Sequence, residues 1–262
     1  METGSYEHRF GGIARLYGDE GVSRIRQAHV CVIGVGGVGS WTVEALARSG
    51  IGTITMVDWD DVCLTNVNRQ LPALSITVGQ AKVDVLAERI GQINPECTVH
   101  PVREFFTIKN ADEMLATEFD YVIDAIDRVG PKAELISRAR KRKLKVLTVG
   151  GAGGRIDMTA IQVADLSRSF DDPLLAQLRK KLRQKYGFPR NPQRRFRVAC
   201  VFSPEPILFP QGDGTVCKER VETPGRTRRS CDTLYGSATF VTGAFGFAAA
   251  QKVVTDIARR ES

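Results

Sequence analysis

The sequence predicts an α/β fold: a doubly wound, Rossmann-like, mostly parallel sheet with a basic C-terminal extension. Three observations lead to this prediction. Short apolar runs alternate with stretches of helical spacing over about the first 165 residues, an order typical of parallel strands joined by crossover helices. The first run ends in a cluster of glycines, and the second run ends in acidic residues. The excess of positive charge lies in the C-terminal part.

The first strand–turn–helix unit lies at residues 30–60. Its apolar run, 30–33, is followed by four glycines in a G-x-G-x-x-G pattern with one additional glycine: Gly34, Gly36, Gly37 and Gly39. Glycines there allow a sharp turn, the close approach of a phosphate and tight packing of the next helix, expected at 41–49. The second strand, 54–57, ends at Asp58, whose carboxylate can accept hydrogen bonds from both ribose hydroxyls. The unit therefore predicts adenine-nucleotide binding.

The elements on either side of this unit are weaker or shorter. An N-terminal arm with a short helix and no core of its own is expected at 9–25. After the acids, alternation continues with a polar loop at 64–71, a helix at 78–94, a strand at 98–101, a short helix at 111–117, a strand at 121–123, a helix at 131–142, a strand at 145–149 and a further strand at 156–163.

The C-terminal part is harder to interpret. An amphipathic helix is expected at 172–186, whereas 187–229 is rich in proline, glycine and arginine. A final helix at 240–258 is apolar, but polar residues interrupt it, so a buried helix is favoured over a membrane span. We therefore expect residues 1–165 to form one domain and residues 166–262 to form a basic part packed on the same core.

Composition narrows the class of protein. Residues 1–150 hold 18 Lys and Arg against 19 Asp and Glu, whereas residues 151–262 hold 19 against 11. This asymmetry predicts an acidic partner for the C-terminal part. The six cysteines form no C-x-x-C pair, which argues against a four-cysteine zinc site. No N-terminal stretch combines a basic start with an apolar core, so a cytoplasmic location and free thiols are expected.

Four charged side chains are candidates for a shared site beside the glycines. Arg69 can clamp a phosphate bidentately, and Lys82 can place an ammonium beside it; solvated surface roles are the alternatives. Asp127 follows a buried strand, where a carboxylate beside a triphosphate commonly holds Mg²⁺, or it caps the next helix. Asp60 can orient its neighbours or reach the metal. A dinucleotide-dependent oxidoreductase would have less use for this set, so the combination favours ATP over NAD.

Together these residues resemble the ubiquitin-activating-like (E1-like) adenylation superfamily, which includes the MoeB and ThiF proteins. The order and spacing of five motifs match over about residues 9–165: the glycine turn, Asp58-x-Asp60, Asn66-x-Asn68-Arg69-Gln70, Gly79-Gln80-x-Lys82 and Asp124-x-x-Asp127. The resemblance implies a homodimer in which a carboxylate attacks the α-phosphate of Mg-ATP, giving an acyl-adenylate and pyrophosphate. It also implies that Asp58 holds ribose, that Asn66, Arg69 and Lys82, with the neighbouring Gln70, line the phosphates, and that Asp127 binds Mg²⁺.

The departures from the superfamily pattern point to one branch. The two zinc-binding C-x-x-C pairs are missing, and an N-terminal Arg-Tyr-x-Arg-Gln pattern is reduced to its first arginine, Arg9. With its basic insert the chain resembles the tRNA threonylcarbamoyladenosine dehydratase branch. That resemblance implies that ATP activates the threonyl carboxylate of a modified adenosine beside a tRNA anticodon, and that the carbamoyl group then closes a ring. A monovalent cation is a further candidate cofactor.

The basic insert is the candidate tRNA-binding segment. Nine cations without an intervening acid lie at Arg179, Lys180, Lys181, Arg183, Lys185, Arg190, Arg194, Arg195 and Arg197. Three aromatic residues are interleaved, which favours RNA binding over a solvated helix face; Arg226, Arg228 and Arg229 could extend the patch. Cys231 is a candidate nucleophile of the kind found in sulfur-transferring relatives, with a simple free thiol as its alternative.

Three other functions stay open at this point. An NAD-dependent oxidoreductase would bind NADH and not ATP. An adenylating enzyme for a small sulfur-carrier protein would require a Gly-Gly-tailed partner and would ignore tRNA, with sulfur-transfer proteins as its partners. A non-catalytic RNA-binding module would leave ATP unconsumed.

Overall fold

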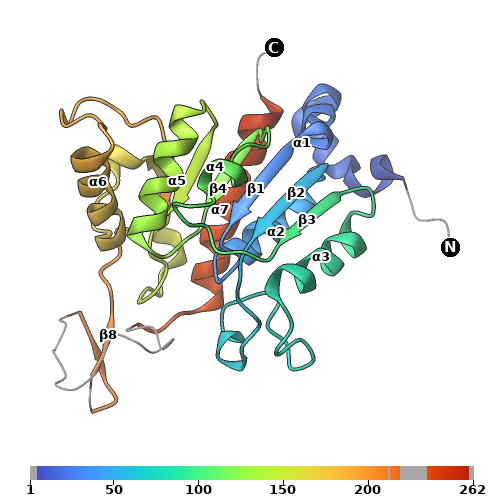
Figure 1. The fold of residues 1–262 in the computed structure, drawn as a ribbon. Helices are drawn as coiled ribbons and strands as arrows, with labels where there is room; N and C mark the ends of the chain where they lie inside the picture. The colour runs from blue at the N-terminus through green and yellow to red at the C-terminus, as the bar shows by residue number, and fades with distance from the viewer. Residues whose placement is uncertain (1–4, 212, 219–234, 260–262) are drawn as a thin grey trace.

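A twisted, mostly parallel sheet forms the centre of the molecule (Figure 1). The computed structural model describes residues 5–211, 213–218 and 235–259. Within them, seven strands follow the order β3-β2-β1-β4-β5-β7-β6. Their bounds are β1 His29–Ile33, β2 Thr53–Val57, β3 Thr98–Val102, β4 Tyr121–Asp124, β5 Val146–Val149, β6 Gln162–Asp165 and β7 Ala199–Phe202. The predicted α/β, doubly wound class is confirmed.

Helices cover both faces of this sheet (Figure 1). One face packs against α1 (Tyr6–Gln27), α2 (Gly39–Arg48), α3 (Lys82–Ile93) and α7 (Thr239–Ala258). The other face packs against α4 (Ala111–Met114), α5 (Val129–Lys141) and α6 (Pro173–Lys185). Short 3-10 helices are η1 (Leu64–Asn66), η2 (Met158–Ala160) and η3 (Leu166–Arg168), and β8 (Phe209–Pro210) pairs with β9 (Val216–Cys217).

The apolar runs are buried on both faces because successive side chains of a strand point to opposite sides. In β1, Val30 and Val32 join the core under α2 and α7, whereas Cys31 and Ile33 join the core under α5. The parallel register pairs Ile33 with Val57 and with Asp124. The carboxyl ends of β1, β2 and β4 therefore lie side by side.

The N-terminal arm differs from expectation. Instead of a short helix without a core, residues 6–27 form α1, which consists of two helical segments that meet at a kink at Gly18. Tyr6, Phe10 and Ile25 are buried, and the Tyr6 hydroxyl donates a hydrogen bond of 2.6 Å to the carbonyl of Gly50. The arm therefore shares the main core, which the scattered apolar residues of this stretch did not reveal.

The C-terminal part also differs in two places. The strand expected at 156–163 is wrong: η2 occupies 158–160, and the strand is β6, which runs antiparallel to β7. The apolar run 199–202 was not assigned to a strand, yet β7 pairs in parallel with β5 and is buried. The sheet thus contains strands from both sides of residue 165, and the division there stays a prediction.

The apolar C-terminal stretch forms α7, as expected. It packs mainly on α2 and α1. None of the described helices combines the length and apolar character that crossing a membrane requires.

Candidate active site

The glycine turn joins β1 to α2. Gly34 has a φ of +88°, and a Cβ added to Gly39 would lie 1.8 Å from the carbonyl oxygen of Gly34, so both positions require glycine. Among the described residues, the backbone N–H groups of Gly36, Gly37 and Val38 have no hydrogen-bond acceptor. Free N–H groups before a helix form a ready site for a phosphate.

Asp58 ties the end of β2 to this turn. Its two carboxylate oxygens accept hydrogen bonds from the backbone N–H of Val35, at 2.8 Å, and of Asp60, at 2.9 Å. Each oxygen retains lone-pair capacity, so the carboxylate can also accept hydroxyl donors. The predicted ribose ligand is therefore held beside the predicted phosphate turn.

Asp60 pairs with Lys82, the first residue of α3. The Lys82 ammonium lies 2.9 Å from an Asp60 oxygen, and the lysine side chain is 5% exposed whereas that of Asp60 is 54% exposed. Lys82 also donates its backbone N–H to the Asp60 carbonyl at 3.1 Å. The lysine is therefore not a solvated surface residue, and its ammonium is fixed at Asp60, two residues after Asp58.

The loop after β2 brings Arg69 and Gln70 over the glycines. A Cβ added to Gly37 would lie 3.7 Å from the Arg69 Cγ, and one added to Gly36 would lie 3.8 Å from the Gln70 Nε2. Arg69 donates only to neutral oxygens, those of Thr65 and Asn68, among the described residues, so its charge is not neutralised. The Gln70 Oε1 is buried and has no hydrogen-bond partner among the described residues.

Asn66 shapes this loop from within. Its side-chain oxygen accepts the backbone N–H of Cys63 at 3.1 Å, and its carbonyl accepts the N–H groups of Arg69 and Gln70 at 3.0 and 2.9 Å. The side-chain amide nitrogen of Asn66 makes no hydrogen bond to the described residues. It therefore remains a donor for a phosphate oxygen.

Residues that the motifs did not indicate hold the loop from α2 and α7. The Trp41 indole N–H and the Thr242 hydroxyl donate to the Arg69 carbonyl, at 3.1 and 3.2 Å. The Thr239 hydroxyl donates to the Asn68 carbonyl at 2.5 Å. The sequence signal for the contacts from α7 was the presence of Thr239 and Thr242 in an otherwise apolar stretch.

Asp127 lies just beyond the end of β4. It is exposed and makes no hydrogen bond or ion pair to any residue that the structure describes. Arg128, and not Asp127, is the N-cap of α5, so the capping alternative is excluded. The preceding Ala125 donates its N–H to Ile33 at 2.9 Å, and a Cβ on Gly34 would meet its carbonyl at 3.0 Å. A free carboxylate beside the phosphate turn suits a magnesium ion, which binds few protein ligands.

A buried ion pair lies beneath this carboxylate, and sequence reasoning missed it. Lys132 and Asp124 are both 0% exposed, with 3.0 Å between ammonium and carboxylate. A second buried pair joins Arg155 to Asp172, the N-cap of α6, at 3.6 Å; burial lowers the pKa of Arg155. The signal for the first pair was the helical spacing. Lys132 lies three, four and seven residues before Leu135, Ile136 and Ala139, which places it on the apolar face of its helix.

The basic insert runs along α6 and the loop that follows. Six of its nine cations are exposed: Lys180, Lys185, Arg190, Arg194, Arg195 and Arg197. Arg179, Lys181 and Arg183 are half-buried; Arg179 donates to the Ser169 hydroxyl, and burial beside Arg183 lowers its pKa.

The aromatic residues of the insert are not exposed for base stacking. Phe188 and Phe196 are each 3% exposed and pack edge to face at 5.0 Å between ring centroids. The guanidinium of Arg183 lies over Phe196 at 5.2 Å. These two rings therefore form the core beneath the charges, and the interleaved aromatic pattern does not by itself support RNA binding.

The cysteines differ in exposure, and Cys97 and Cys217 are half-buried. Cys231 lies outside the described residues, as do Arg226, Arg228 and Arg229. Cys31 and Cys200 are buried, and burial raises the pKa of Cys31 to about 12. Cys63 is exposed in the loop after β2, where a hydrogen bond from the Thr65 hydroxyl lowers its pKa.

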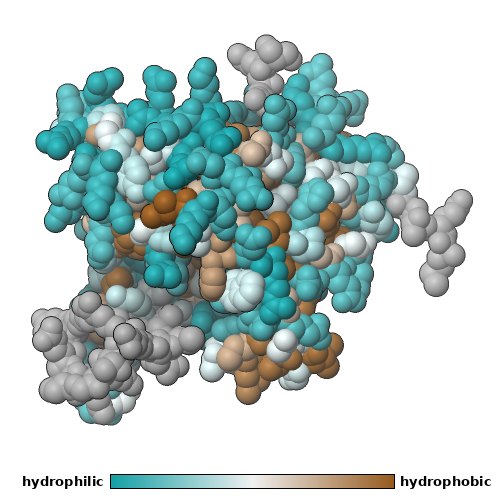
Figure 2. Space-filling view, in the orientation of Figure 1, coloured by the Kyte–Doolittle hydropathy of each residue, from teal (hydrophilic) through white to brown (hydrophobic). Residues whose placement is uncertain are grey.

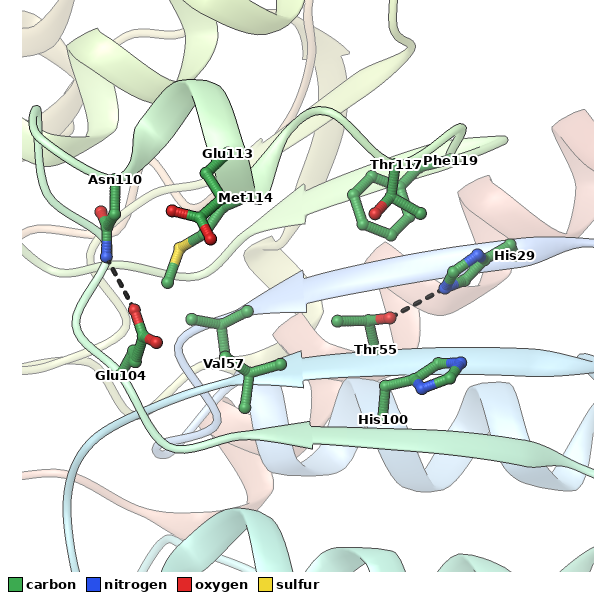
Figure 3. A pocket seen from close by; sticks show the side chains of 11 residues that line it. His29, Thr55, Val57, His100, Glu104, Asn110, Glu113, Met114, Thr117 and Phe119 are labelled. Atoms are coloured by element: carbon green, nitrogen blue, oxygen red, sulfur yellow. Dashed lines mark hydrogen bonds between the residues drawn. The ribbon is translucent and has the colours of Figure 1, made fainter.

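A pocket of about 340 Å³ whose lining includes none of the glycines of the turn lies between α4 and the face of β1, β2 and β3 (Figure 3). Glu104 and Glu113 lie at one end, and His29 and His100 at the other (Figure 3). Burial, together with the neighbouring His100, lowers the pKa of His29. Because the charged groups that line it are acidic, this pocket does not suit a phosphate.

These groups define a class of protein: a Rossmann-like nucleotide-binding fold with cations and a free carboxylate around its phosphate turn. The chain belongs to the ThiF family, whose model matches residues 11–261. The predicted resemblance to the E1-like superfamily is thereby confirmed.

Similar proteins narrow the branch. The chain is 50% identical to the tRNA threonylcarbamoyladenosine dehydratase of Haemophilus influenzae over 98% of this chain and 96% of that protein. It is 51% identical to the Escherichia coli protein of the same name, over 94% and 91%. The solved structure of that Escherichia coli dehydratase in complex with ATP matches with a TM-score of 0.83 and 47% identity, over 96% and 94% of the two chains. The predicted branch is confirmed by these likenesses.

Proposed function

We propose that the chain catalyses the ATP-dependent dehydration of N6-threonylcarbamoyladenosine in tRNA through an acyl-adenylate. The observation that supports this most strongly is the set of charges around the carboxyl edge of the sheet: Arg69 lies against the glycine turn, Lys82 pairs with Asp60, and Asp127 follows β4, which pairs with β1. The chain is also half identical to dehydratases of that name. Charged groups in this arrangement can bind a triphosphate, whereas hydride transfer by an oxidoreductase would have less use for them.

The chain's own groups bind and orient ATP in this proposal. The free N–H groups at residues 36–38 and the Arg69 guanidinium hold the phosphates, and Asp58 accepts the ribose hydroxyls. A carboxylate oxygen of the substrate then attacks the α-phosphorus, and the bond to pyrophosphate breaks. Negative charge grows on the α-phosphate oxygens, where the fixed charges of Arg69 and Lys82 stabilise it without reorganisation.

Asp127 is the residue proposed to hold Mg²⁺. Its exposed, unpartnered carboxylate fits a metal that keeps several waters. When bound, the metal would neutralise charge on the outer phosphates. The proposal also allows a monovalent cation, for which the structure offers no assigned ligand.

Ring closure needs no nucleophile from the enzyme. The carbamoyl group of the same nucleoside attacks the activated acyl carbon, and AMP leaves with one oxygen of the former carboxylate. Because both groups belong to one nucleoside, proximity supplies much of the rate. Cys231 as an acyl or sulfur acceptor, with sulfur-transfer proteins as partners, is the competing proposal, and a fully active Cys231→Ser variant would exclude it.

The exposed cations of the basic insert are proposed to contact the tRNA backbone. They carry no compensating acid between residues 179 and 197, and such a stretch attracts phosphates independently of sequence. Cys31, Cys63, Cys97 and Cys200 are free thiols, as is usual in a reducing compartment. A cytoplasmic location is part of the same proposal.

A homodimer is proposed from apolar surface near the site. Figure 2 shows hydrophobic side chains at the lower edge of the molecule, where the loops between β2 and α3 lie in Figure 1. Leu64, Leu74 and Ile76 of these loops are 64%, 53% and 82% exposed, and Phe247 of α7 is 49% exposed. Exposed apolar groups gathered in this way indicate an interface. Light scattering of a Leu74→Asp, Ile76→Asp variant should report a monomer; an unchanged dimer places the interface elsewhere.

Mass analysis of nucleosides tests the function as a whole. Modified tRNA incubated with the protein and ATP should lose one water from its threonylcarbamoyladenosine, with AMP and pyrophosphate as co-products. An unchanged nucleoside, together with pyrophosphate exchange that requires a Gly-Gly-tailed protein, would favour the sulfur-carrier alternative. NADH binding without ATP binding would favour an oxidoreductase, and tRNA binding without ATP consumption would favour an RNA-binding module.

A further inference from the structure

Lys132 is a charged residue in the first turns of α5 whose side chain reaches no solvent. Its ammonium has three donors, and three oxygens surround it: the Asp124 carboxylate at 3.0 Å, the Asp124 carbonyl at 3.3 Å and the Ile126 carbonyl at 2.8 Å. All three acceptors belong to the segment that leads into Asp127. The lysine thus joins α5 to this segment at three points.

Asp124 completes the network from the other side. One carboxylate oxygen accepts the Thr148 hydroxyl of β5 at 2.7 Å in addition to Lys132, and the other accepts the backbone N–H of Ile126 at 3.2 Å. The course of the backbone from 124 to 126 is therefore fixed by β5, by α5 and by its own turn. Asp127 is the next residue, and its own side chain makes no hydrogen bond or ion pair to the described residues.

A buried ion pair of this kind is weak evidence for stability. Removing two charges from water is costly, and apolar side chains of similar volume often serve a core equally well. What a fully hydrogen-bonded buried network provides is a unique local geometry. The place where this network fixes the geometry is the backbone next to the exposed carboxylate, at the carboxyl edge of the sheet.

We propose that Lys132 is a positioning residue, which acts through Asp124 and the 124–126 backbone on the Asp127 carboxylate. It holds this carboxylate where it can bind a divalent cation that also contacts the phosphates of ATP. The inference rests on the proposed function, because it assumes the metal role of Asp127. Partners that orient a metal ligand typically change metal affinity by about 10- to 100-fold when they are removed.

The test variant is the double substitution Asp124→Asn, Lys132→Met. It removes both charges together, so no unpaired ion stays in the core, and the asparagine can still bond to Thr148 and to the Ile126 N–H. Leu135→Ala is the matched control, since Leu135 lies on the same helix, is buried, and has no polar side-chain atom that could join the network. We expect it to weaken the packing of α5 while the hydrogen bonds to the 124–126 backbone stay in place.

The readout is binding of Mn²⁺, measured by electron paramagnetic resonance in the presence of a non-hydrolysable ATP analogue, beside the melting temperature. We expect the double variant to bind Mn²⁺ about 10- to 100-fold more weakly than the parent protein, and Leu135→Ala to bind it within about twofold. Turnover should show a raised KM for Mg-ATP. Mn²⁺ affinity within twofold of the parent in a folded double variant overturns the inference.

Asp127→Ala separates this inference from the proposed function. If Asp127→Ala itself leaves Mn²⁺ binding unchanged, the metal role of Asp127 fails, and the positioning role fails with it. If Asp127→Ala abolishes Mn²⁺ binding while the double variant retains it, only the positioning role is wrong. If the double variant does not melt cooperatively, Thr148→Val replaces it as the test variant. Mn²⁺ binding that is weaker by at least about threefold supports the positioning role of the network, and unchanged binding contradicts it.

Discussion

The carboxyl edge of β1, β2 and β4 and the basic insert at 179–197 are both rich in charge, but they are built differently. At the edge, charged groups are tied to one another over short distances, as in Lys82 with Asp60 and Lys132 with Asp124. In the insert, six of the nine cations are exposed, and the apolar ring pair of Phe188 and Phe196 lies beneath them.

Because their charges are arranged differently, the two regions can recognise different features of a ligand. Preorganised groups at fixed positions can stabilise charge that develops on one atom. Exposed, flexible cations attract a polyanion over a distance and with little sequence preference. We therefore expect substitutions at the edge to change chemistry and substitutions in the insert to change binding.

The largest expected effect concerns stability and not recognition. Phe188→Ala should lower the free energy of unfolding by about 3–5 kcal/mol, because it empties a buried ring site. Chemical denaturation measures this loss. Below the melting temperature, tRNA affinity should stay near that of the parent protein. A stable variant with weak tRNA binding would instead make Phe188 a stacking residue and remove the contrast between the two regions.

Asp127→Ala should reduce turnover by about 10²- to 10³-fold, the size expected when a preorganised electrostatic group is removed from an active site. The fold should be kept, because this carboxylate has no partner among the described residues. Pre-steady-state formation of AMP, with circular dichroism as the control, measures the effect. Turnover close to the parent rate contradicts the assignment of Asp127.

Charge reversal of Arg194, Arg195 and Arg197 to glutamate should weaken tRNA binding and reduce the slope of log affinity against log salt by about 2–3, if each contacts one phosphate. Titrations at several salt concentrations measure the slope. ATP binding by this variant should be unchanged. An unaltered slope places the tRNA on another surface.

The smallest expected effect is a pH dependence from the pocket in Figure 3. Burial lowers the pKa of His29 in the folded protein, whereas the unfolded chain keeps the ordinary value of about 6.5. As pH falls below about 6.5 the unfolded chain binds the proton first, so this histidine stabilises the fold above that pH and its contribution is lost on acidification. The melting temperature of His29→Gln should therefore fall less than that of the parent between about pH 7.5 and 5.5; an equal fall excludes His29.

Much of the fold could be predicted because its signals are local. The apolar runs that became β1, β2, β4 and β5, and the glycines between β1 and α2, needed only neighbouring residues. By contrast, β7 pairs with β5 across a separation of about 50 residues in sequence, and the apolar run 199–202 is too short to indicate its partner. The burial of α1 likewise depends on contacts with Gly50 and α7.

The same distinction holds for the candidate site. Asp58, Asp60, Arg69, Lys82 and Asp127 could be proposed as site residues because they lie in short motifs that follow strands or glycines. The role of Lys132 could not be predicted. Its spacing indicates a buried helix face, but its partner, Asp124 at the end of β4, is known only from the folded structure. The burial of Phe188 and Phe196 could not be predicted for the same reason, since spacing alone does not reveal which side of a loop is covered.

The central claim is that a carboxylate of the substrate attacks the α-phosphorus of ATP. Transfer of label tests it most directly: tRNA carrying ¹⁸O in the threonyl carboxylate is converted with unlabelled ATP, and the AMP is analysed by mass spectrometry. The account predicts AMP that contains one labelled oxygen, with pyrophosphate unlabelled. Dehydrated nucleoside formed with unlabelled AMP, or with ADP and labelled phosphate, would contradict it.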